Sequence, residues 1–140
     1  MKWYFASRTR HQKKLAELAQ FLEEKGEVVL ADWLNVEVFA NYESNLHKVE
    51  EFNRKIIKAL LATEIFVLIS DPEGTDMFIE LGICLAHKEL SGKKRIYIVG
   101  KHSRRSLMQL HPDITHVNSL EEVLDAEAVQ YDGFAIPALD

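Results

Sequence analysis

The run Ile65-Phe66-Val67-Leu68-Ile69-Ser70-Asp71 constrains the fold of this chain more than any other segment. It opens with consecutive apolar residues, several of them β-branched or aromatic, which predict a strand that is buried on both faces. The strand ends in a polar turn, Ser-Asp-Pro-Glu-Gly, and the residues after that turn predict an apolar helix. Such a turn lies at the carboxyl edge of a sheet, where open α/β sheets bind their ligands.

Strands and helices alternate along the whole chain. We expect strands at residues 2–6, 27–33, 65–70, 95–99 and 114–117. We expect helices at residues 8–25, 44–60 and 75–90, a short one near residues 104–110, and a last one after residue 119. This alternation predicts a mainly parallel five-stranded sheet with helices on both faces. Right-handed crossovers favour the flavodoxin-like order 2-1-3-4-5, so residues 1–140 are expected to form one α/β domain, a three-layer sandwich.

Local signals mark the ends of several helices. Gly26 is expected to stop the first helix, and Ser44 is expected to cap the second after a loop at residues 34–43. The run Ser119-Leu120-Glu121-Glu122 is a capping box for the last helix. The second helix carries a stripe of inward positions, which are Leu46, Val49, Asn53, Ile56, Ile57 and Leu60.

Charge and cysteine content exclude several classes of protein. The formal net charge is -5, which argues against a nucleic-acid polymer as partner because such binders show a basic face. Cys84 is the only cysteine in the sequence, so no intrachain disulfide can form and a reducing cytoplasm is expected. No apolar run approaches the roughly 20 residues that span a bilayer, and residues 1–6 are too short for a signal peptide. We therefore expect no membrane partner.

Glu80 is the carboxylate that most needs an explanation. It lies among the apolar residues of the helix that follows the buried strand, and burying an unpaired charge is costly. Asp76 lies one turn earlier on the same helix face, and Asp71 ends the strand itself. Carboxylates in different environments can take different acid and base roles, which favours a catalytic site. Alternatively, Glu80 simply reaches solvent or bonds a neighbour.

The first strand-to-helix turn, Ala6-Ser7-Arg8-Thr9-Arg10-His11, carries positive charge and hydroxyl groups. Free N–H groups at a helix N-terminus favour anions, so Ser7, Arg8 and Arg10 could form a cradle for a phosphate or a sugar hydroxyl. Alternatively, Ser7 caps the helix and the arginines are solvated. The turn has no glycine, so a dinucleotide-binding site is not indicated.

Other polar and aromatic residues leave two interpretations open. Tyr4 could direct its hydroxyl into a site or fill the core, and Trp33 could stack on a base or cover the edge of the sheet. Asn53 could reach a pocket or bond the backbone, since a buried amide needs partners. The scattered histidines and acids show no established metal-ligand spacing, so no metal site is expected. Cys84 is interpreted as a small buried hydrophobic residue.

Three segments resemble the nucleoside 2-deoxyribosyltransferase family, which includes deoxynucleotide N-glycosidase-like enzymes. They are residues 2–7, residues 65–71 and, above all, Gly74-Thr75-Asp76-Met77-Phe78-Ile79-Glu80-Leu81-Gly82. The likeness extends over roughly residues 2–124 and is specific at the Glu-Leu-Gly helix. It implies a flavodoxin-like five-stranded parallel sheet and a chemistry that cleaves or transfers an N-glycosidic bond.

The resemblance implies a role for individual residues. Glu80 matches the glutamate that attacks C1′ of the deoxyribose and forms a covalent glycosyl-enzyme, and Tyr4 matches the tyrosine that orients it. Asp71 or Asp76 would protonate the leaving base. Ser7 would face the sugar or phosphate, and the arginines beside it suggest a phosphorylated sugar. A carboxylate nucleophile divides one hard displacement into two easier ones, as in retaining glycosidases.

The chain departs from the family pattern on the helix before the buried strand. Family members usually carry an aspartate there that contacts the sugar, whereas this chain has Ile56, with Asn53 one turn earlier. The resemblance also implies a homo-oligomer whose sites are completed by a neighbouring subunit. Asn118 and the tail at residues 128–140 are candidates for that contact.

Three hypotheses follow for the function. The first is an enzyme that cleaves or transfers the base of a 2′-deoxynucleoside or its 5′-monophosphate, with no cofactor and no metal. The second is a module that binds or senses a nucleotide without turnover, which the missing aspartate favours. The third is hydrolysis of a ribonucleotide such as NAD. Glu80, Asp76, Asp71 and Tyr4 are the expected catalytic residues. The expected substrate contacts are Ser7, Arg8, Arg10, Trp33, Asn53, Gly74 and Asn118.

Overall fold

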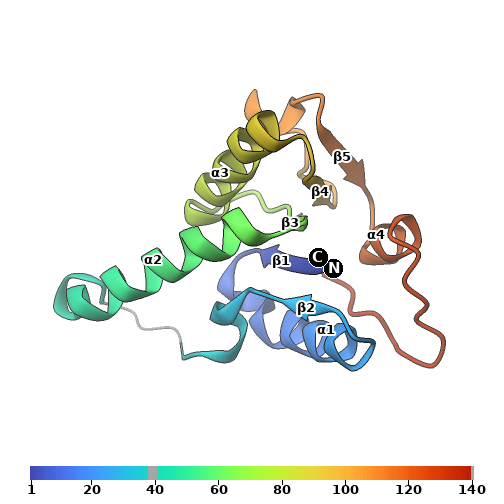
Figure 1. The fold of residues 1–140 in the computed structure, drawn as a ribbon, viewed down its shortest axis with the longest axis horizontal. Helices are drawn as coiled ribbons and strands as arrows, with labels where there is room; N and C mark the ends of the chain where they lie inside the picture. Colours follow the sequence, from blue (N-terminus) through green and yellow to red (C-terminus); the bar gives the residue numbers. More distant parts are fainter. Residues whose placement is uncertain (38–40, 140) are drawn as a thin grey trace.

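A parallel five-stranded sheet forms the centre of the molecule (Figure 1). The structure is a computed structural model that describes residues 1–37 and 41–139. The strands are β1 (Lys2–Ala6), β2 (Val28–Val29), β3 (Ile65–Ile69), β4 (Arg95–Val99) and β5 (Ile114–Val117). Every pairing is parallel and the order is β2-β1-β3-β4-β5. The predicted fold class and strand order are therefore confirmed.

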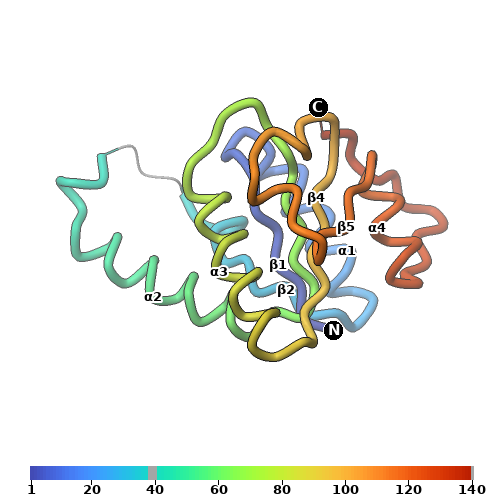
Figure 2. The backbone as a smooth tube through the Cα atoms, turned by 90° about the horizontal axis from the view of Figure 1, so that it is seen from above, coloured from blue at the N-terminus to red at the C-terminus, as the bar shows by residue number. Residues whose placement is uncertain are grey.

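Helices cover both faces of the sheet. They are α1 (Gln12–Glu24), α2 (Leu46–Ala62), α3 (Asp76–Ser91) and α4 (Leu120–Ala126). The pair α2 and α3 lies on one face, and the pair α1 and α4 lies on the other (Figures 1 and 2). All of β3 is buried between these layers, as its uninterrupted apolar sequence predicted. None of the helices in the described parts of the chain is long and apolar enough to cross a membrane.

The second strand is shorter than predicted. Only Val28 and Val29 pair with β1, and the N–H of Asp32 then turns back to the carbonyl of Leu30. Trp33 lies in a 3-10 turn, η2 (Asp32–Asn35), rather than at the end of a strand. Its indole N–H donates to the Phe5 carbonyl at 2.8 Å, so a side chain takes a hydrogen bond that a longer strand could have formed.

Two predicted helix starts differ from the structure, which places a 3-10 turn before each helix. Arg8 is extended, the next residues form a 3-10 turn, η1 (Thr9–His11), and α1 begins at Gln12. Ser44 does not cap α2, because it lies in the 3-10 turn η3 (Glu43–Asn45), and its N–H donates to the Asn41 side chain at 3.0 Å. Part of the predicted loop at residues 34–43 lies outside the described residues.

Two predictions in the last third of the chain had different outcomes. The short helix near residues 104–110 is reduced to the 3-10 turn η4 (Met108–Leu110). The buried Gln109 side chain donates to the His102 carbonyl at 3.1 Å, which holds the preceding residues in turns instead. The Ser119 cap is confirmed, since its hydroxyl accepts the N–H of Glu122 at 3.4 Å. The Glu122 carboxylate accepts the N–H of Asn118 rather than that of Ser119, so the reciprocal bond of the capping box is shifted by one residue.

The carboxyl end of α2 is tied to the sheet by a buried lysine. The Lys94 ammonium donates to the carbonyls of Leu60, at 2.6 Å, and Thr63, so it satisfies groups that a helix end leaves unpaired. Burial lowers the pKa of Lys94. The other end of α2 extends beyond the sheet (Figures 1 and 2), and Leu60 is its one buried residue. Most of the predicted inward stripe is consequently half-buried or exposed.

Candidate active site

A cavity of about 860 Å³ lies on the α2 and α3 side of the sheet. The turn after β1, the helix α2 and the first turns of α3 contribute most of its lining. The polar and charged lining residues are Tyr4, Ser7, Arg8, Thr9, Glu37, Tyr42, Asn53, Glu73, Thr75, Asp76 and Glu80. These groups come from segments far apart in the sequence, and they meet where β1 and β3 end. The sheet edge that the sequence predicted for ligand binding is thus the edge that carries the cavity.

Glu80 and Tyr4 form a hydrogen-bonded pair in this cavity. The Tyr4 hydroxyl donates to the Glu80 carboxylate across a separation of 76 residues in the sequence. Tyr4 is only 1% exposed, and its ring stacks on Phe66 with centroids 6.0 Å apart. Glu80 is half-buried in the second turn of α3. A rigid strand therefore positions a donor against a carboxylate that the helix brings to the cavity.

The surroundings of Glu80 oppose its ionisation only in part. Burial raises the pKa of Glu80 from 4.5 to about 7, the Tyr4 hydrogen bond lowers it, and the nearby Asp76 carboxylate raises it. Burial and the Glu80 charge also raise the pKa of Tyr4, so this phenol keeps its proton and remains a donor. A desolvated carboxylate whose pKa lies near 7 is partly ionised at neutral pH and is suited to nucleophilic or base chemistry.

Asp76 and Gly74 line the same cavity at the start of α3. Asp76 is exposed and begins the helix. Gly74 has a φ of +123°, and a Cβ added there would lie 2.8 Å from the Met77 side chain. A residue other than glycine would therefore be strained at this position and would press on the Met77 side chain.

Asp71 occupies a different environment from Asp76. It is 1% exposed and does not line the cavity. Its carboxylate pairs with Arg10, lies 3.9 Å from the Arg8 guanidinium, and accepts the N–H of Glu73 at 2.9 Å. Asp71 thus fixes the loop after β3 and holds Arg10 outside the cavity lining. Of the two aspartates that the sequence left open as acids, the structure brings Asp76 to the cavity.

The remaining predicted substrate contacts are divided between the cavity and other places. Ser7, Arg8, Trp33 and Asn53 line it, and Asn53 is exposed rather than buried in an apolar stripe, because α2 extends beyond the sheet. Asn118 lies outside the lining, where its N–H donates to the Glu122 carboxylate at 2.5 Å.

Arg105 was not predicted from the sequence. Its guanidinium donates to the Asp71 carbonyl at 3.0 Å, so it supports the loop from the segment after β4. The rule that loops at the carboxyl edge gather around a ligand could have drawn attention to it.

Possible metal ligands lie away from the cavity. Among the described residues, Glu89, His111 and Asp113 could bring three ligand atoms within 4.8 Å of one another. None of the three lines the cavity, and Glu89 lies near the opposite end of α3 from Asp76. Cys84 is buried and its pKa is raised to about 12, chiefly by burial, so it remains a thiol.

Comparison with known proteins establishes the fold. No family model matches the sequence. No curated protein is similar to it in sequence. Among solved structures, the chain is similar to the CMP N-glycosidase BcmB of Clostridium botulinum, with a TM-score of 0.58 and 17% sequence identity. The likeness covers 93% of this chain and 100% of that chain. At this identity the similarity shows that the two chains share a fold.

Proposed function

We propose that this chain cleaves the N-glycosidic bond of a 2′-deoxynucleoside or its 5′-monophosphate, as a member of the nucleoside 2-deoxyribosyltransferase family. The observation that carries the proposal is the Tyr4–Glu80 pair in the large cavity. Glu80 belongs to the Glu-Leu-Gly helix on which the family resemblance rests. The shared fold with a CMP N-glycosidase supports the same class of reaction.

The reaction proceeds in two displacements. In the first, a Glu80 oxygen forms a bond to C1′, the bond from C1′ to the base nitrogen breaks, and its electron pair leaves with the base. Asp76 donates the proton that neutralises the base, because it lines the cavity one turn from Glu80. In the second, water adds to C1′, the Glu80 ester bond breaks, and the proton of water returns to Asp76. A second base in place of water would complete a transfer.

A chromatographic assay of free base tests the proposal. The wild-type protein is incubated with deoxynucleosides, ribonucleosides and their 5′-monophosphates, with and without a second base, beside Glu80→Gln. We expect the wild type alone to release base. Comparison of the deoxyribose substrates with the ribose substrates identifies the sugar that the protein accepts. If no substrate loses its base while a nucleotide still raises the melting temperature, the chain is a nucleotide-binding module and the proposed chemistry is wrong.

Arg8 is the cavity residue best placed to recognise a 5′-phosphate. Its guanidinium lies 3.1 Å from the Glu73 carboxylate, and both groups line the cavity. Both side chains are substantially exposed, so this ion pair is weak and a phosphate can replace the carboxylate.

Arg8→Gln should therefore raise KM for 5′-monophosphates about tenfold, as expected for the loss of about 1.4 kcal/mol of binding. It should leave KM for the unphosphorylated nucleosides nearly unchanged. Steady-state kinetics on matched pairs check this, and Lys101→Gln, in the exposed turn after β4, is the control for the loss of one charge. Equal effects on both members of each pair would show that Arg8 does not contact phosphate.

We also propose that two copies associate through the face that carries α2. Leu46, Ile57 and Leu61 of α2 are 59%, 42% and 46% exposed, and Ile79 of α3 is 62% exposed. Ile57 and Ile79 also line the cavity, so a second copy on this face would help to close it. Large exposed apolar surfaces are uncommon on monomers. Sedimentation equilibrium should give a dimer or larger species, which Ile57→Glu converts to monomer, whereas a monomeric wild type would contradict this assembly.

A further inference from the structure

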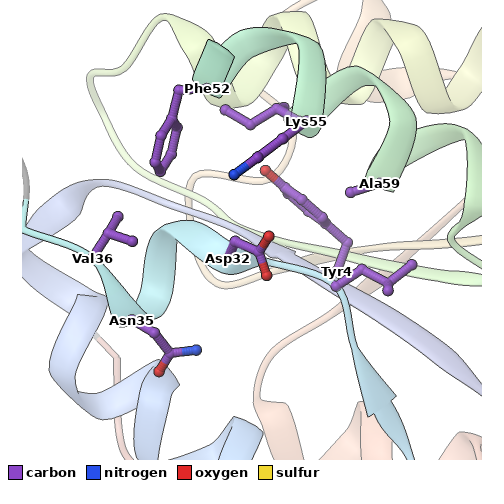
Figure 3. Close-up of a pocket in the computed structure, with 9 residues that line it drawn as sticks. Tyr4, Asp32, Asn35, Val36, Phe52, Lys55 and Ala59 are labelled. Atoms are coloured by element: carbon purple, nitrogen blue, oxygen red, sulfur yellow. The ribbon is translucent and has the colours of Figure 1, made fainter. Parts of the chain in front are cut away.

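A smaller cavity, of about 230 Å³, lies beside the large one. The two share Tyr4, Val36, Phe52 and Ile56. The smaller cavity is completed by Leu30, Asp32, Asn35, Lys55 and Ala59, which come from the segment after β2 and from α2. Most of this lining is apolar, and Asp32 and Lys55 are its charged members. Figure 3 shows Asp32 on the η2 side, Lys55 reaching in from α2, and Tyr4 between them.

Tyr4 relates the position of this cavity to that of Glu80. The Tyr4 hydroxyl donates to Glu80, and Tyr4 also lines the smaller cavity, so the space lies one side chain away from the carboxylate. In the proposed reaction C1′ lies at Glu80, and the phosphate lies toward Arg8 in the turn after β1. The base is bonded directly to C1′, so it must occupy space next to Glu80 that the phosphate does not use. The smaller cavity adjoins that space at Tyr4, and its apolar walls suit a planar ring. The far edge of the base can enter it while the glycosidic nitrogen stays beside Glu80 and Asp76 in the large cavity.

We propose that Asp32 and Lys55 select a base that carries an exocyclic amino group beside an unprotonated ring nitrogen, as in cytosine and adenine. This inference rests on the proposed function, because it takes Glu80 as the position of C1′. An ionised carboxylate only accepts hydrogen bonds, and an ammonium only donates them. Cytosine and adenine present an amino donor to Asp32 and a ring-nitrogen acceptor to Lys55. Asp32 and Lys55 therefore match the two groups on this edge of the base, the amino group and the ring nitrogen beside it.

The same pair rejects the corresponding keto bases. Uracil and hypoxanthine place a carbonyl oxygen where the amino group would be, and an N–H where the ring nitrogen would be. The carbonyl then faces the Asp32 carboxylate, and the N–H faces the Lys55 ammonium, so neither contact forms. Lys55 also pairs with Glu51 at 3.4 Å, but both groups are more than half exposed, so a ligand can draw Lys55 away from that partner. Discrimination thus comes from a mismatch as well as from attraction.

Asp32→Asn tests the inference, because asparagine has nearly the same shape and carries both a donor and an acceptor. The substrates are two matched pairs of 5′-monophosphates: deoxycytidine against deoxyuridine, and deoxyadenosine against deoxyinosine. We expect the wild type to favour the amino member in kcat/KM and Asp32→Asn to reduce that ratio at least about tenfold. Glu50→Gln, at an exposed α2 position that lines neither cavity, removes the same charge and should leave the ratio unchanged.

Binding measurements separate this inference from the proposed function. Calorimetric titration of Glu80→Gln with the same four nucleotides gives a preference that does not depend on turnover. We expect tighter binding of the amino members, and loss of that preference in the double variant that also carries Asp32→Asn. If the wild type releases base but the preference is absent or survives Asp32→Asn, the inference is wrong and the proposed function stands. If no base is released, an Asp32-dependent binding preference supports the subsite alone, and no preference overturns it.

Discussion

Replacing Glu80 by glutamine is expected to reduce base release at least about a thousandfold, because a neutral amide cannot form the glycosyl ester. Glutamine keeps the shape of the side chain and a carbonyl that can accept the Tyr4 hydrogen bond, so the fold should persist. The rate is measured by chromatography of free base under single-turnover conditions. Release by Glu80→Gln at more than about a tenth of the wild-type rate would exclude Glu80 as the nucleophile.

The same substitution should stabilise the protein at alkaline pH. Burial raises the folded-state pKa of Glu80 to about 7 from 4.5, so the folded protein binds a proton more tightly than the unfolded chain does. The contribution of Glu80 to wild-type stability is therefore most favourable below about pH 4.5 and is lost as pH rises through about 7. Glutamine carries no charge at either pH. The free energy of unfolding of Glu80→Gln should exceed that of the wild type by about 2–3 kcal/mol near pH 8.

Urea unfolding near pH 8 and again near pH 4.5 measures this difference. It should shrink to a small remainder at the lower pH, because the wild-type carboxyl is then protonated in the folded state and about half protonated in the unfolded state. A difference that is the same at both pH values would show that Glu80 does not titrate as its burial implies. Such stabilisation with loss of activity is the usual sign of a functional group held in an unfavourable environment.

Tyr4→Phe is expected to lower kcat/KM about 30-fold near neutral pH, with two separable causes. The Tyr4 hydrogen bond orients Glu80 and lowers its pKa, so its removal leaves a misoriented carboxylate that ionises only at higher pH. The acidic limb of the pH profile of kcat/KM should accordingly move upward from about pH 7. Part of the lost rate should return at higher pH, where a larger fraction of the variant carboxylate is ionised.

The chain offers a matched control in Tyr97→Phe. Tyr97 is also buried, and its hydroxyl donates to the Glu127 carboxylate at 2.5 Å, but neither residue lines the cavity. This variant loses a comparable hydrogen bond and should keep the wild-type pH profile. If Tyr97→Phe and Tyr4→Phe have the same effect on kcat/KM, the loss reflects general destabilisation and Tyr4 has no special role.

The sheet could be predicted from the sequence because its signals are local. An uninterrupted apolar run such as β3 can be buried only between two layers, and regular alternation with helices leaves few topologies. The predictions that were wrong concern details that depend on tertiary contacts. Trp33 lies in a turn because its indole bonds the Phe5 carbonyl, and the residues before Gln109 remain in turns because that side chain is buried against them. No local propensity encodes such contacts.

The same distinction between local sequence signals and tertiary contacts applies to the site. Glu80 could be found from the sequence because a carboxylate among apolar residues is unusual, and because it lies in the Glu-Leu-Gly segment that carries the family resemblance. The sequence could not separate Asp71 from Asp76, since both follow β3 closely and the difference is the partner that each meets. Arg10 neutralises Asp71 from 61 residues away. Likewise, the stripe on α2 has the period of a buried face, but the helix extends beyond the sheet that would bury it.

The covalent intermediate is the most direct test of the account. A deoxynucleoside 5′-monophosphate with fluorine at C2′ should slow both displacements, because fluorine destabilises the positive charge that develops at C1′ in each. The protein is quenched during the first turnover, and its peptides are weighed by mass spectrometry. We predict a burst of free base and a matching mass gain of one sugar phosphate on the peptide that contains Glu80. A burst of base with an unmodified Glu80 peptide, or with the sugar on another residue, would contradict the proposed mechanism.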